Sequence, residues 1–369
     1  MVGVVDLTNN RFLLIKSWGC GFWSDVDHVM GQLLAAEVTN RIPVVYWGSN
    51  SLYSESFKGN AFELYFEPVS AYTVEDLIRP DYTYYPPIWN NKNLTVEDLD
   101  KVAWAYRNIG DMMLSDANVV VSDTHYFIRP IIQFIPKTHW AYGMTAHQIY
   151  RCLFDKYIRL KPDIQEEIEQ FYNENMKDSR PLLGVHIRGG DKVKEVENLS
   201  HLNKKYHQTI QTFVSRYGIK KILLLTDCQE ILDDFKKRYG KMVVYTDCKR
   251  GQINDTENAP HLTGYSERRR KGIEIIKDTY LAAKCDFFIG NGYSNVSYTV
   301  KRLRDWPDSN MVLFYRDLKH EMKLAKKRVK ADWRRRKYEK VHHKAEYPEL
   351  YGGVNTYADE SIFINKIIG

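Results

Sequence analysis

The chain has 369 residues, a formal net charge of +6 and 44% hydrophobic residues. This length exceeds one ordinary hydrophobic core and predicts two domains, and the composition excludes a fibrous or disordered protein. Residues 1–10 lack a long apolar run, and we expect neither a signal peptide nor a transmembrane helix. Five scattered cysteines without metal-binding spacing argue against a disulfide framework, so we expect a cytoplasmic protein.

The N-terminal segment has a strand–loop–helix–strand pattern. The apolar run at 11–16 predicts a strand, and the glycines at 19–21 predict a tight loop. Apolar residues at helical spacing predict a helix that begins at Ser24 or Asp25, and the next strand is expected at 44–47. A glycine loop at a helix N-terminus favours anions, although a purely structural turn explains the same glycines.

The remaining elements alternate along the chain. In the first half we expect a helix at 94–107, a strand at 118–121 and helices at 146–157 and 162–175, with an irregular Tyr/Pro-rich segment at 82–89. The polar break at 177–180 is the expected domain boundary. In the second half we expect strands at 182–187, 221–226, 242–245, 286–289 and 311–315, with helices near 202–217, 231–235, 273–281 and 296–303. This alternation predicts a parallel, doubly wound sheet.

One stretch, Leu182–Lys192, runs from an apolar strand directly into a polar cluster that contains His186, Arg188 and two glycines. Arginine offers a rigid fork of donors that suits phosphate, and glycines let backbone N–H groups approach an anion closely. The pattern indicates a phosphate site. A strand that ends in a solvated polar turn is the structural alternative for this stretch taken alone.

Three strands of the second half end in such polar clusters: His186 and Arg188, Thr226 and Asp227, and Asn291, Ser294 and Asn295. Because the carboxyl ends of parallel strands share one edge of the sheet, these side chains are expected to converge there. Three unrelated turns would not be expected to place a polar cluster at the end of each of three strands. The sequence therefore predicts a nucleotide-phosphate site at that edge.

These motifs resemble those of the α1,6-, α1,2- and protein O-fucosyltransferase superfamily, with the greatest similarity to bacterial nodulation and core α1,6-fucosyltransferases. The similar segments are Gly184–Lys192, Thr226-Asp227, Asp278–Leu281 with Cys285–Val296, the loop Gly19-Cys20-Gly21-Phe22 with His28, and Asn60–Pro68. Together they span about residues 11–315. Their order and spacing make the resemblance more specific than any single motif.

The resemblance implies an α/β, GT-B-like fold with two Rossmann-type domains that contain parallel sheets. It implies an N-terminal domain at 1–178 on the acceptor side, a donor-binding domain at 179–316 and a basic helical tail at 317–369. The implied activity is an inverting, metal-independent transfer of L-fucose, or a related deoxysugar, from a GDP-sugar to a glycan or glycolipid hydroxyl. No cofactor or metal is expected, and Asp25-Val26-Asp27, which matches a metal-binding DxD pattern, is interpreted as helix capping.

The resemblance also assigns roles to individual residues. The implied catalytic residues are Arg188, Asp191, Lys192 and Glu197, with Glu195 as the alternative to Glu197. The implied donor-binding residues are Gly19, Cys20, Gly21, His186, Arg188, Asp227, Asp278, Ser294 and Asn295. Among these, Arg188 matches the arginine on the donor pyrophosphate and Asp278 matches the carboxylate near the guanosine.

Two positions depart from the family pattern. Gly189 stands where core enzymes have a second arginine, and Cys228 stands where the second motif has a paired acid. These departures keep an alternative open, in which the chain is a catalytically inactive sugar- or nucleotide-binding protein of the same fold. They also leave the acceptor and the identity of the sugar undecided.

The basic character is concentrated in one segment. Residues 316–344 contain 13 Lys/Arg and 4 Asp/Glu, a net charge of +9, so the rest of the chain has a net charge of −3. Leu318, Met322, Ala325, Val329 and Trp333 form an apolar stripe along 318–344, which predicts a basic amphipathic helix that contacts a membrane surface peripherally or packs back on the protein. A nucleic-acid-binding protein is a third hypothesis, which the acidic remainder and the absence of a recognition motif disfavour.

Overall fold

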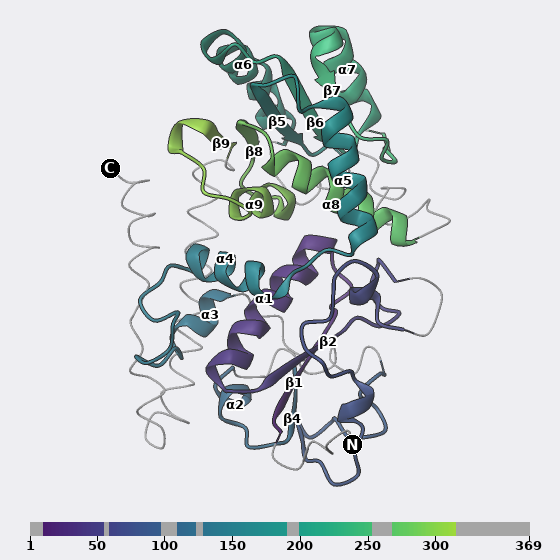
Figure 1. Ribbon diagram of the computed structural model, residues 1–369, viewed down its shortest axis with the longest axis vertical. Helices are drawn as coiled ribbons and strands as arrows, with labels where there is room; N and C mark the ends of the chain where they lie inside the picture. Colours follow the sequence, from purple (N-terminus) through teal and green to yellow (C-terminus); the bar gives the residue numbers. More distant parts are fainter. Residues whose placement is uncertain are drawn as a thin grey trace. The chain divides into compact units, whose positions relative to one another are not determined.

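The structure is a computed structural model that describes residues 10–54, 59–96, 109–122, 128–189, 199–252 and 268–314. The described residues fall into two compact units, the first formed by residues up to Cys20 and Ser24–Arg159, the second by Gly21–Trp23 and Leu160 onward (Figure 1). The division in the chain lies between residues 159 and 160. The domain boundary expected after residue 178 stays a prediction.

The first unit is built on a four-stranded sheet with the strand order β2-β1-β4-β3, in which all neighbours are parallel. The strands are β1 (Phe12–Lys16), β2 (Ile42–Tyr46), β3 (Tyr84–Tyr85) and β4 (Val119–Ser122). Parallel neighbours require crossover connections. Helix α1 (Phe22–Val38) is the crossover between β1 and β2, and it begins earlier than Ser24 or Asp25, where the sequence placed its start.

The rest of the first unit consists of shorter elements. They are η2 (Ala61–Leu64), η3 (Glu75–Leu77), α2 (Ile109–Leu114), α3 (Ile128–Ile132) and α4 (Ala146–Tyr157). Helix α4 has the predicted bounds and begins with a capping box between Thr145 and Gln148. The prediction of a helix at 94–107 is wrong at its start, since residues 94 and 95 form a turn and residue 96 is irregular, and residues 97–107 lie outside those described. The segment at 82–89 is irregular except for strand β3.

The second unit is a doubly wound domain with a five-stranded sheet in the order β7-β6-β5-β8-β9, again parallel throughout. Its strands are β5 (Leu182–Ile187), β6 (Lys221–Thr226), β7 (Val243–Val244), β8 (Phe287–Asn291) and β9 (Met311–Phe314). The predicted bounds of β5 and β6 are confirmed. The predicted parallel sheet is confirmed as well.

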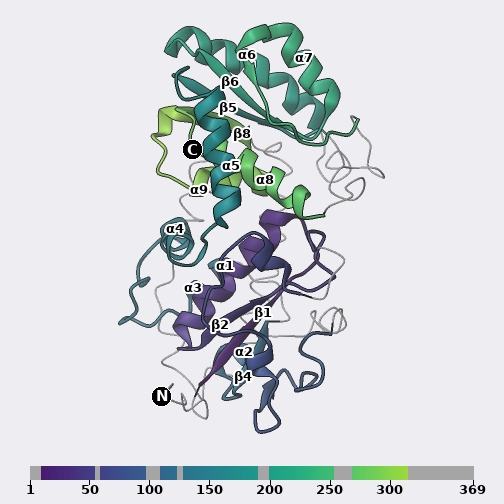
Figure 2. The same cartoon turned by 45° about the vertical axis from the view of Figure 1, so that its right-hand side comes forward.

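Helices cover both faces of this sheet. They are α5 (Pro162–Asn175), α6 (Leu199–Tyr217), α7 (Gln229–Tyr239), α8 (Arg268–Ala283) and α9 (Asn295–Arg302), with the short turns η7 (Gly240–Met242) and η8 (Asp308–Asn310). Helices α6 and α7 lie on one face, and α5, α8 and α9 lie on the other (Figure 2). This three-layer arrangement explains why the central strand β5 is buried along its whole length.

Side chains of β5 alternate between the two faces. Leu183, Val185 and Ile187 belong to the apolar core beneath α6 and α7. Gly184 and His186 lie on the opposite face, where a Cβ on Gly184 would come within 3.0 Å of a Phe288 ring atom. The absence of a side chain at position 184 therefore lets the neighbouring strand and helix pack closely around the strand that leads into the polar cluster.

The C-terminal region after Phe314 lies outside the described residues, and so does the basic stretch 318–344 with its predicted amphipathic helix. Among the helices that the structure does describe, none is both long enough and apolar enough to cross a bilayer.

A substitution at Gly290 tests the close packing of β8. An added Cβ would lie 2.5 Å from Ser297 Oγ and 2.7 Å from Phe288 Cε1. Because overpacking of a tight core costs about 1–3 kcal/mol, we expect Gly290→Ala to lower the free energy of unfolding by that amount in a denaturant titration. Gly21→Ala is the control, since a Cβ there meets no atom within 4 Å. Equal stability of the two variants would contradict the packing described here.

Candidate functional site

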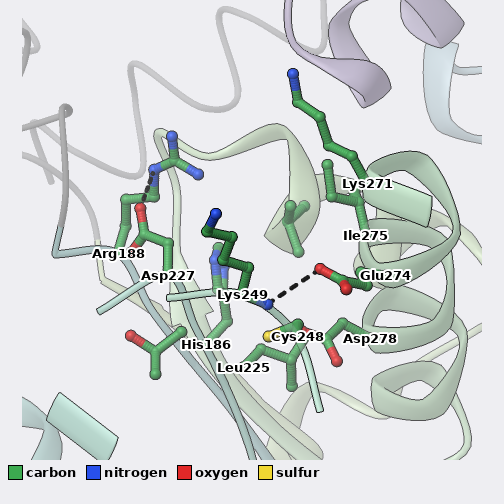
Figure 3. A pocket seen from close by; sticks show the side chains of 12 residues that line it. His186, Arg188, Leu225, Asp227, Cys248, Lys249, Lys271, Glu274, Ile275 and Asp278 are labelled. Atoms are coloured by element: carbon green, nitrogen blue, oxygen red, sulfur yellow. Dashed lines mark hydrogen bonds and ion pairs between the residues drawn. The ribbon is translucent and has the colours of Figure 1, made fainter. Parts of the chain in front are cut away.

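A polar pocket lies in the second unit, where β5 and β6 end beside helix α8 (Figure 3). Its empty space is about 630 Å³ when the open solvent at the mouth is counted. It is lined by His186, Arg188, Leu225, Thr226, Asp227, Cys248, Lys249, Lys271, Glu274, Ile275, Asp278 and Val296. The pocket thus occupies the sheet edge at which the sequence placed a phosphate site.

Asp227, which follows β6, links the ends of the two central strands. Its Oδ1 accepts a hydrogen bond from the Gly189 N–H at 2.9 Å, and its Oδ2 lies 3.2 Å from Arg188 Nε. Both charged side chains are less than one-fifth exposed, so their mutual attraction is only partly screened by water. Arg188 Nε and Asp227 Oδ2 form an ion pair whose geometry is not that of a hydrogen bond, and the two terminal guanidinium nitrogens point away from Asp227 (Figure 3). A guanidinium oriented in this way can donate to an oxyanion.

His186 is a buried neutral imidazole. Burial, reinforced by the nearby Arg188 charge, lowers the pKa of His186 to about 4. Its Nδ1 lies 2.7 Å from Ser297 Oγ, which also accepts the Asn291 N–H at 3.1 Å. The Ser297 hydroxyl has a second lone pair and a hydrogen left after it accepts the Asn291 N–H, and when it donates that hydrogen to Nδ1 the neutral imidazole carries its own hydrogen on Nε2. That Nε2–H is a donor suited to a ligand oxygen.

Asp278 is a carboxylate on α8 with a raised proton affinity. Burial raises its pKa to about 6, against the opposing effects of the Thr246 hydroxyl and the Arg250 charge. The Thr246 hydroxyl donates to one carboxylate oxygen. Arg250 holds the segment around Thr246 through hydrogen bonds to the carbonyls of Thr246 and Cys248 at 2.9 and 3.0 Å. At neutral pH Asp278 is ionised and can accept hydrogen bonds from a ligand.

The wall formed by α8 and the segment after β7 contains residues that sequence reasoning missed. The Lys249 N–H donates to Glu274 Oε2 at 3.2 Å, next to Cys248 (Figure 3). Lys271 is almost fully buried, and burial lowers its pKa to about 8. Lys271, Glu274 and Asp278 lie on one face of α8, because they are spaced by three and four residues. The sequence could therefore have predicted Lys271 and Glu274 as neighbours of Asp278. No local pattern marks Cys248 or Lys249.

The two departures from the family pattern are in contact with each other. A Cβ on Gly189 would lie 3.0 Å from Cys228 Cβ and 2.6 Å from Ile231 Cδ1, so a larger residue at 189 requires these neighbours to move. The Cys228 thiol is buried, donates to Glu230 at 3.0 Å and has its pKa raised to about 12, chiefly by burial. The positive charge expected at 189 and the negative charge expected at 228 are thus replaced together, which leaves the local charge balanced.

Four of the predicted site residues line the pocket, namely His186, Arg188, Asp227 and Asp278. Ser294 is buried just before α9 and Asn295 is exposed as its first residue, whereas the next residue, Val296, reaches the pocket. Gly19 and Cys20 lie in a loop of the first unit and Gly21 groups with the second, and none of the three lines the pocket. Asp191, Lys192 and Glu197, with the alternative Glu195, lie outside the described residues.

The prediction that Asp25 caps the helix is wrong, because α1 begins at Phe22 and Asp25 lies within its first turns. Its buried carboxylate accepts backbone N–H bonds from Trp18 and Cys20 at 3.3 Å, which holds the glycine loop against the start of α1. Burial raises the pKa of Asp25 to about 7. In the parts of the chain that the structure covers, no three His, Cys, Asp or Glu side chains are grouped to hold a metal ion.

Comparisons with known proteins point to one family. Residues 147–303 match the family model of the α-(1,6)-fucosyltransferase N- and catalytic domains. A search of curated proteins finds no match. The fold resembles NodZ α-1,6-fucosyltransferase soaked with GDP-fucose, with a TM-score of 0.51 and 19% identity over 80% of this chain and 92% of NodZ. A structure of NodZ from Bradyrhizobium gives a TM-score of 0.52 at 19% identity, over 79% of this chain and 92% of that chain.

A variant of FUT1 from Arabidopsis thaliana in complex with GDP is similar as well, with a TM-score of 0.51 and 11% identity over 84% of this chain and 71% of FUT1. At these identities the structural matches establish the shared fold. Together with the family match they confirm the predicted resemblance to the fucosyltransferase superfamily and the GT-B-like α/β fold.

The titration of His186 tests the described electrostatics of the pocket. We expect its imidazole to stay neutral from pH 8 to pH 5 and to protonate with a midpoint of about 4, because burial disfavours the charged form. Nitrogen chemical shifts from NMR, assigned with a His186→Gln variant, measure both the midpoint and the tautomer. Ser297→Ala should raise the population with hydrogen on Nδ1. A midpoint near the ordinary value of 6.5 would show that the imidazole is solvated.

Proposed function

We propose that this fucosyltransferase-like glycosyltransferase transfers L-fucose, or a related deoxysugar, from a GDP-sugar to a hydroxyl of a glycan or glycolipid. The observation on which the proposal rests is one pocket at the ends of β5 and β6 that is lined both by Arg188, which is paired with Asp227, and by Asp278 on α8 (Figure 3). NodZ soaked with GDP-fucose and the FUT1 variant in complex with GDP have the same fold, which supports a GDP-sugar donor.

The chemistry of the leaving group supports a central role for Arg188. As the bond between the sugar and the diphosphate breaks, negative charge grows on the phosphate oxygen, and a fixed cationic donor stabilises it. Arg188 can supply that donor because Asp227 holds the guanidinium by Nε. The neutral His186 can donate a further hydrogen bond to a ligand oxygen without adding charge. These groups allow a transfer that does not depend on a metal ion.

The transfer also needs a base for the acceptor proton. In an inverting reaction the acceptor oxygen attacks from the side opposite the diphosphate, and its proton passes to a nearby carboxylate or relay. Asp191 and Glu197, with Lys192 beside them, follow Arg188 closely in sequence, and they remain our candidates for this part of the reaction.

Asp278 is suited to recognition of the guanine base. An ionised carboxylate accepts the N1–H and the exocyclic amino group of guanine as a pair, whereas adenine has no N–H at N1. The Thr246 hydroxyl fixes the orientation of the carboxylate by donating to one of its oxygens. Buried polar groups that match one base reject a base that leaves them unpaired. This is the basis on which we expect GDP-sugars to be preferred over other nucleotide sugars.

The acceptor is proposed from the sequence. The segment 316–344 has a net charge of +9 and an apolar stripe, a combination that favours peripheral contact with an anionic membrane surface. A cytoplasmic enzyme that modifies a lipid-linked oligosaccharide would meet its acceptor at such a surface. We therefore propose a glycan or lipid-linked oligosaccharide as acceptor.

The alternative, a nucleotide-binding protein without turnover, rests on the joint replacement at Gly189 and Cys228. It predicts that GDP stabilises the fold while no GDP-sugar is ever cleaved. The experiment below separates it from the proposed transferase.

Slow hydrolysis of the donor tests the proposed function. We incubate the protein with GDP-fucose, other GDP-sugars and UDP-sugars in EDTA and measure the released nucleotide. We expect release of GDP from one GDP-sugar, and a loss of about 100-fold to 1,000-fold in Arg188→Ala, since one oxyanion donor is worth about 2.7–4 kcal/mol of barrier. Release that requires a divalent ion would disprove metal independence.

The control for this loss is Arg238→Ala. Arg238 also pairs with an aspartate, Asp234 at 2.8 Å, but it lies exposed on α7 and lines no part of the pocket. Thermal unfolding of both variants checks that the fold is kept. Undiminished release by Arg188→Ala would refute its role, and thermal stabilisation by GDP without any release would favour the alternative.

The pH dependence of donor binding tests the role of Asp278. Its pKa of about 6 is raised above the ordinary 3.8, so the ionised form that accepts the guanine N–H groups is lost as the pH falls through 6. We expect the affinity for GDP-fucose, whose diphosphate does not titrate in this range, to fall about tenfold between pH 7 and pH 5. Isothermal titration calorimetry at pH 7, 6 and 5 measures this affinity. Asp278→Asn should bind more weakly and show no such pH dependence, whereas an unchanged dependence would refute the assignment.

A further inference from the structure

Helix α5 packs along α8 through a row of ion pairs. Each acidic side chain in the row contacts a basic one on α8 or directly after it. Asp163 pairs with Arg269 at 2.6 Å, Glu167 with Arg270 at 2.7 Å and Lys277 at 2.8 Å, and Glu169 with Lys284, the residue that follows α8, at 2.7 Å. Helix α8 also supplies Lys271, Glu274 and Asp278 to the pocket. The row therefore connects a helix outside the pocket to one of its walls.

Glu167 is the most strongly engaged acid of this row. Its two oxygens accept a bidentate pair of hydrogen bonds from Arg270, both at 2.7 Å, and one of them also accepts from Lys277. These bonds, with Arg270 contributing most, lower the pKa of Glu167 to about 2. The Arg270 and Glu167 side chains are 39% and 30% exposed, and ion pairs at such exposure add little to stability. The geometry therefore points to a role other than stability alone.

Arg270 lies between two carboxylates. Its Nε is 3.8 Å from Glu274 Oε1, one helical turn further along α8. Glu274 is almost buried, and its other oxygen accepts the Lys249 N–H at 3.2 Å. That hydrogen bond fixes the segment after β7 against α8, where Cys248 and Lys249 form part of the pocket wall. If Arg270 changes its partner, the position of the Glu274 carboxylate changes with it. The hydrogen bond that holds Lys249, and hence the pocket wall, changes as well.

We propose that Glu167 is a positioning residue for this pocket. By holding Arg270 in a bidentate pair, it keeps the guanidinium from closing on Glu274 and so leaves the Glu274 carboxylate to hold Lys249. Without the Glu167 charge, Arg270 moves onto Glu274 Oε1 and draws the carboxylate away from the Lys249 N–H, which Oε2 accepts. The identification of the ligand as a GDP-sugar rests on the proposed function, whereas the coupling from α5 to the wall does not.

Four variants separate this coupling from the simple loss of an ion pair. Glu167→Gln releases Arg270, and we expect the dissociation constant of GDP, measured by calorimetry, to rise about fivefold to tenfold because a hydrogen bond to a charged group is weakened. Arg270→Gln leaves Glu274 with Lys249, so the affinity should stay within about twofold of the unmodified chain. The double variant should regain that affinity. Glu169→Gln, which removes a similar ion pair away from the pocket, is the matched control.

Two results would overturn the proposal: an equal loss of GDP affinity in Glu167→Gln and Arg270→Gln, or a double variant that binds GDP no better than Glu167→Gln. If the ion pair were only structural, removal of either partner would weaken binding to the same extent. A second readout needs no ligand. The Cys248 thiol is sheltered in the wall, and its alkylation by a small reagent, followed by peptide mass spectrometry, should be faster in Glu167→Gln than in the other variants. Unchanged Cys248 reactivity refutes the coupling, whereas an unmodified chain that binds no GDP refutes the proposed function instead.

Discussion

The Asp227 carboxylate is the contact on which the geometry of the pocket depends. One oxygen fixes the backbone at Gly189 and the other fixes the Arg188 guanidinium, so one side chain at the end of β6 sets both groups that follow β5. The contact is available because β5 and β6 are parallel neighbours in which Ile187 pairs with Thr226, and their carboxyl ends coincide. A buried charge without its partner is costly, so the two side chains stabilise each other's position.

Sequence reasoning located the elements that have strong periodicity of their own. Strands β5 and β6 are short and mostly apolar, and α4 and α5 have regular apolar spacing with a capping residue or proline at the start, so their bounds could be predicted. The two-residue strand β3 and the short helix α3 lack such a signal. Their conformation is decided by pairing and packing with distant segments, which a local pattern does not encode.

The residues of the site also fall into those that the sequence could predict and those that it could not. Strand ends could be predicted to converge, which gave His186, Arg188 and Asp227, and the family resemblance added Asp278. The wall around Lys249 could not be predicted, because the contact that forms it, from the Lys249 N–H to Glu274, joins segments that are 25 residues apart and have no shared pattern. Residues that belong to the site but not to a motif are visible only when the fold brings them together.

Helix α5 belongs to the second unit although it precedes the polar break in the sequence. Its acidic side chains pair with basic side chains on α8 and with Lys284 directly after α8. If the second unit were exchanged between relatives by a cut after residue 178, the basic side chains on and directly after α8 would lose the acidic partners that α5 supplies. A cut after Arg159 would transfer both sides of the row. Recombination, natural or in the laboratory, should therefore transfer α5 together with the second unit.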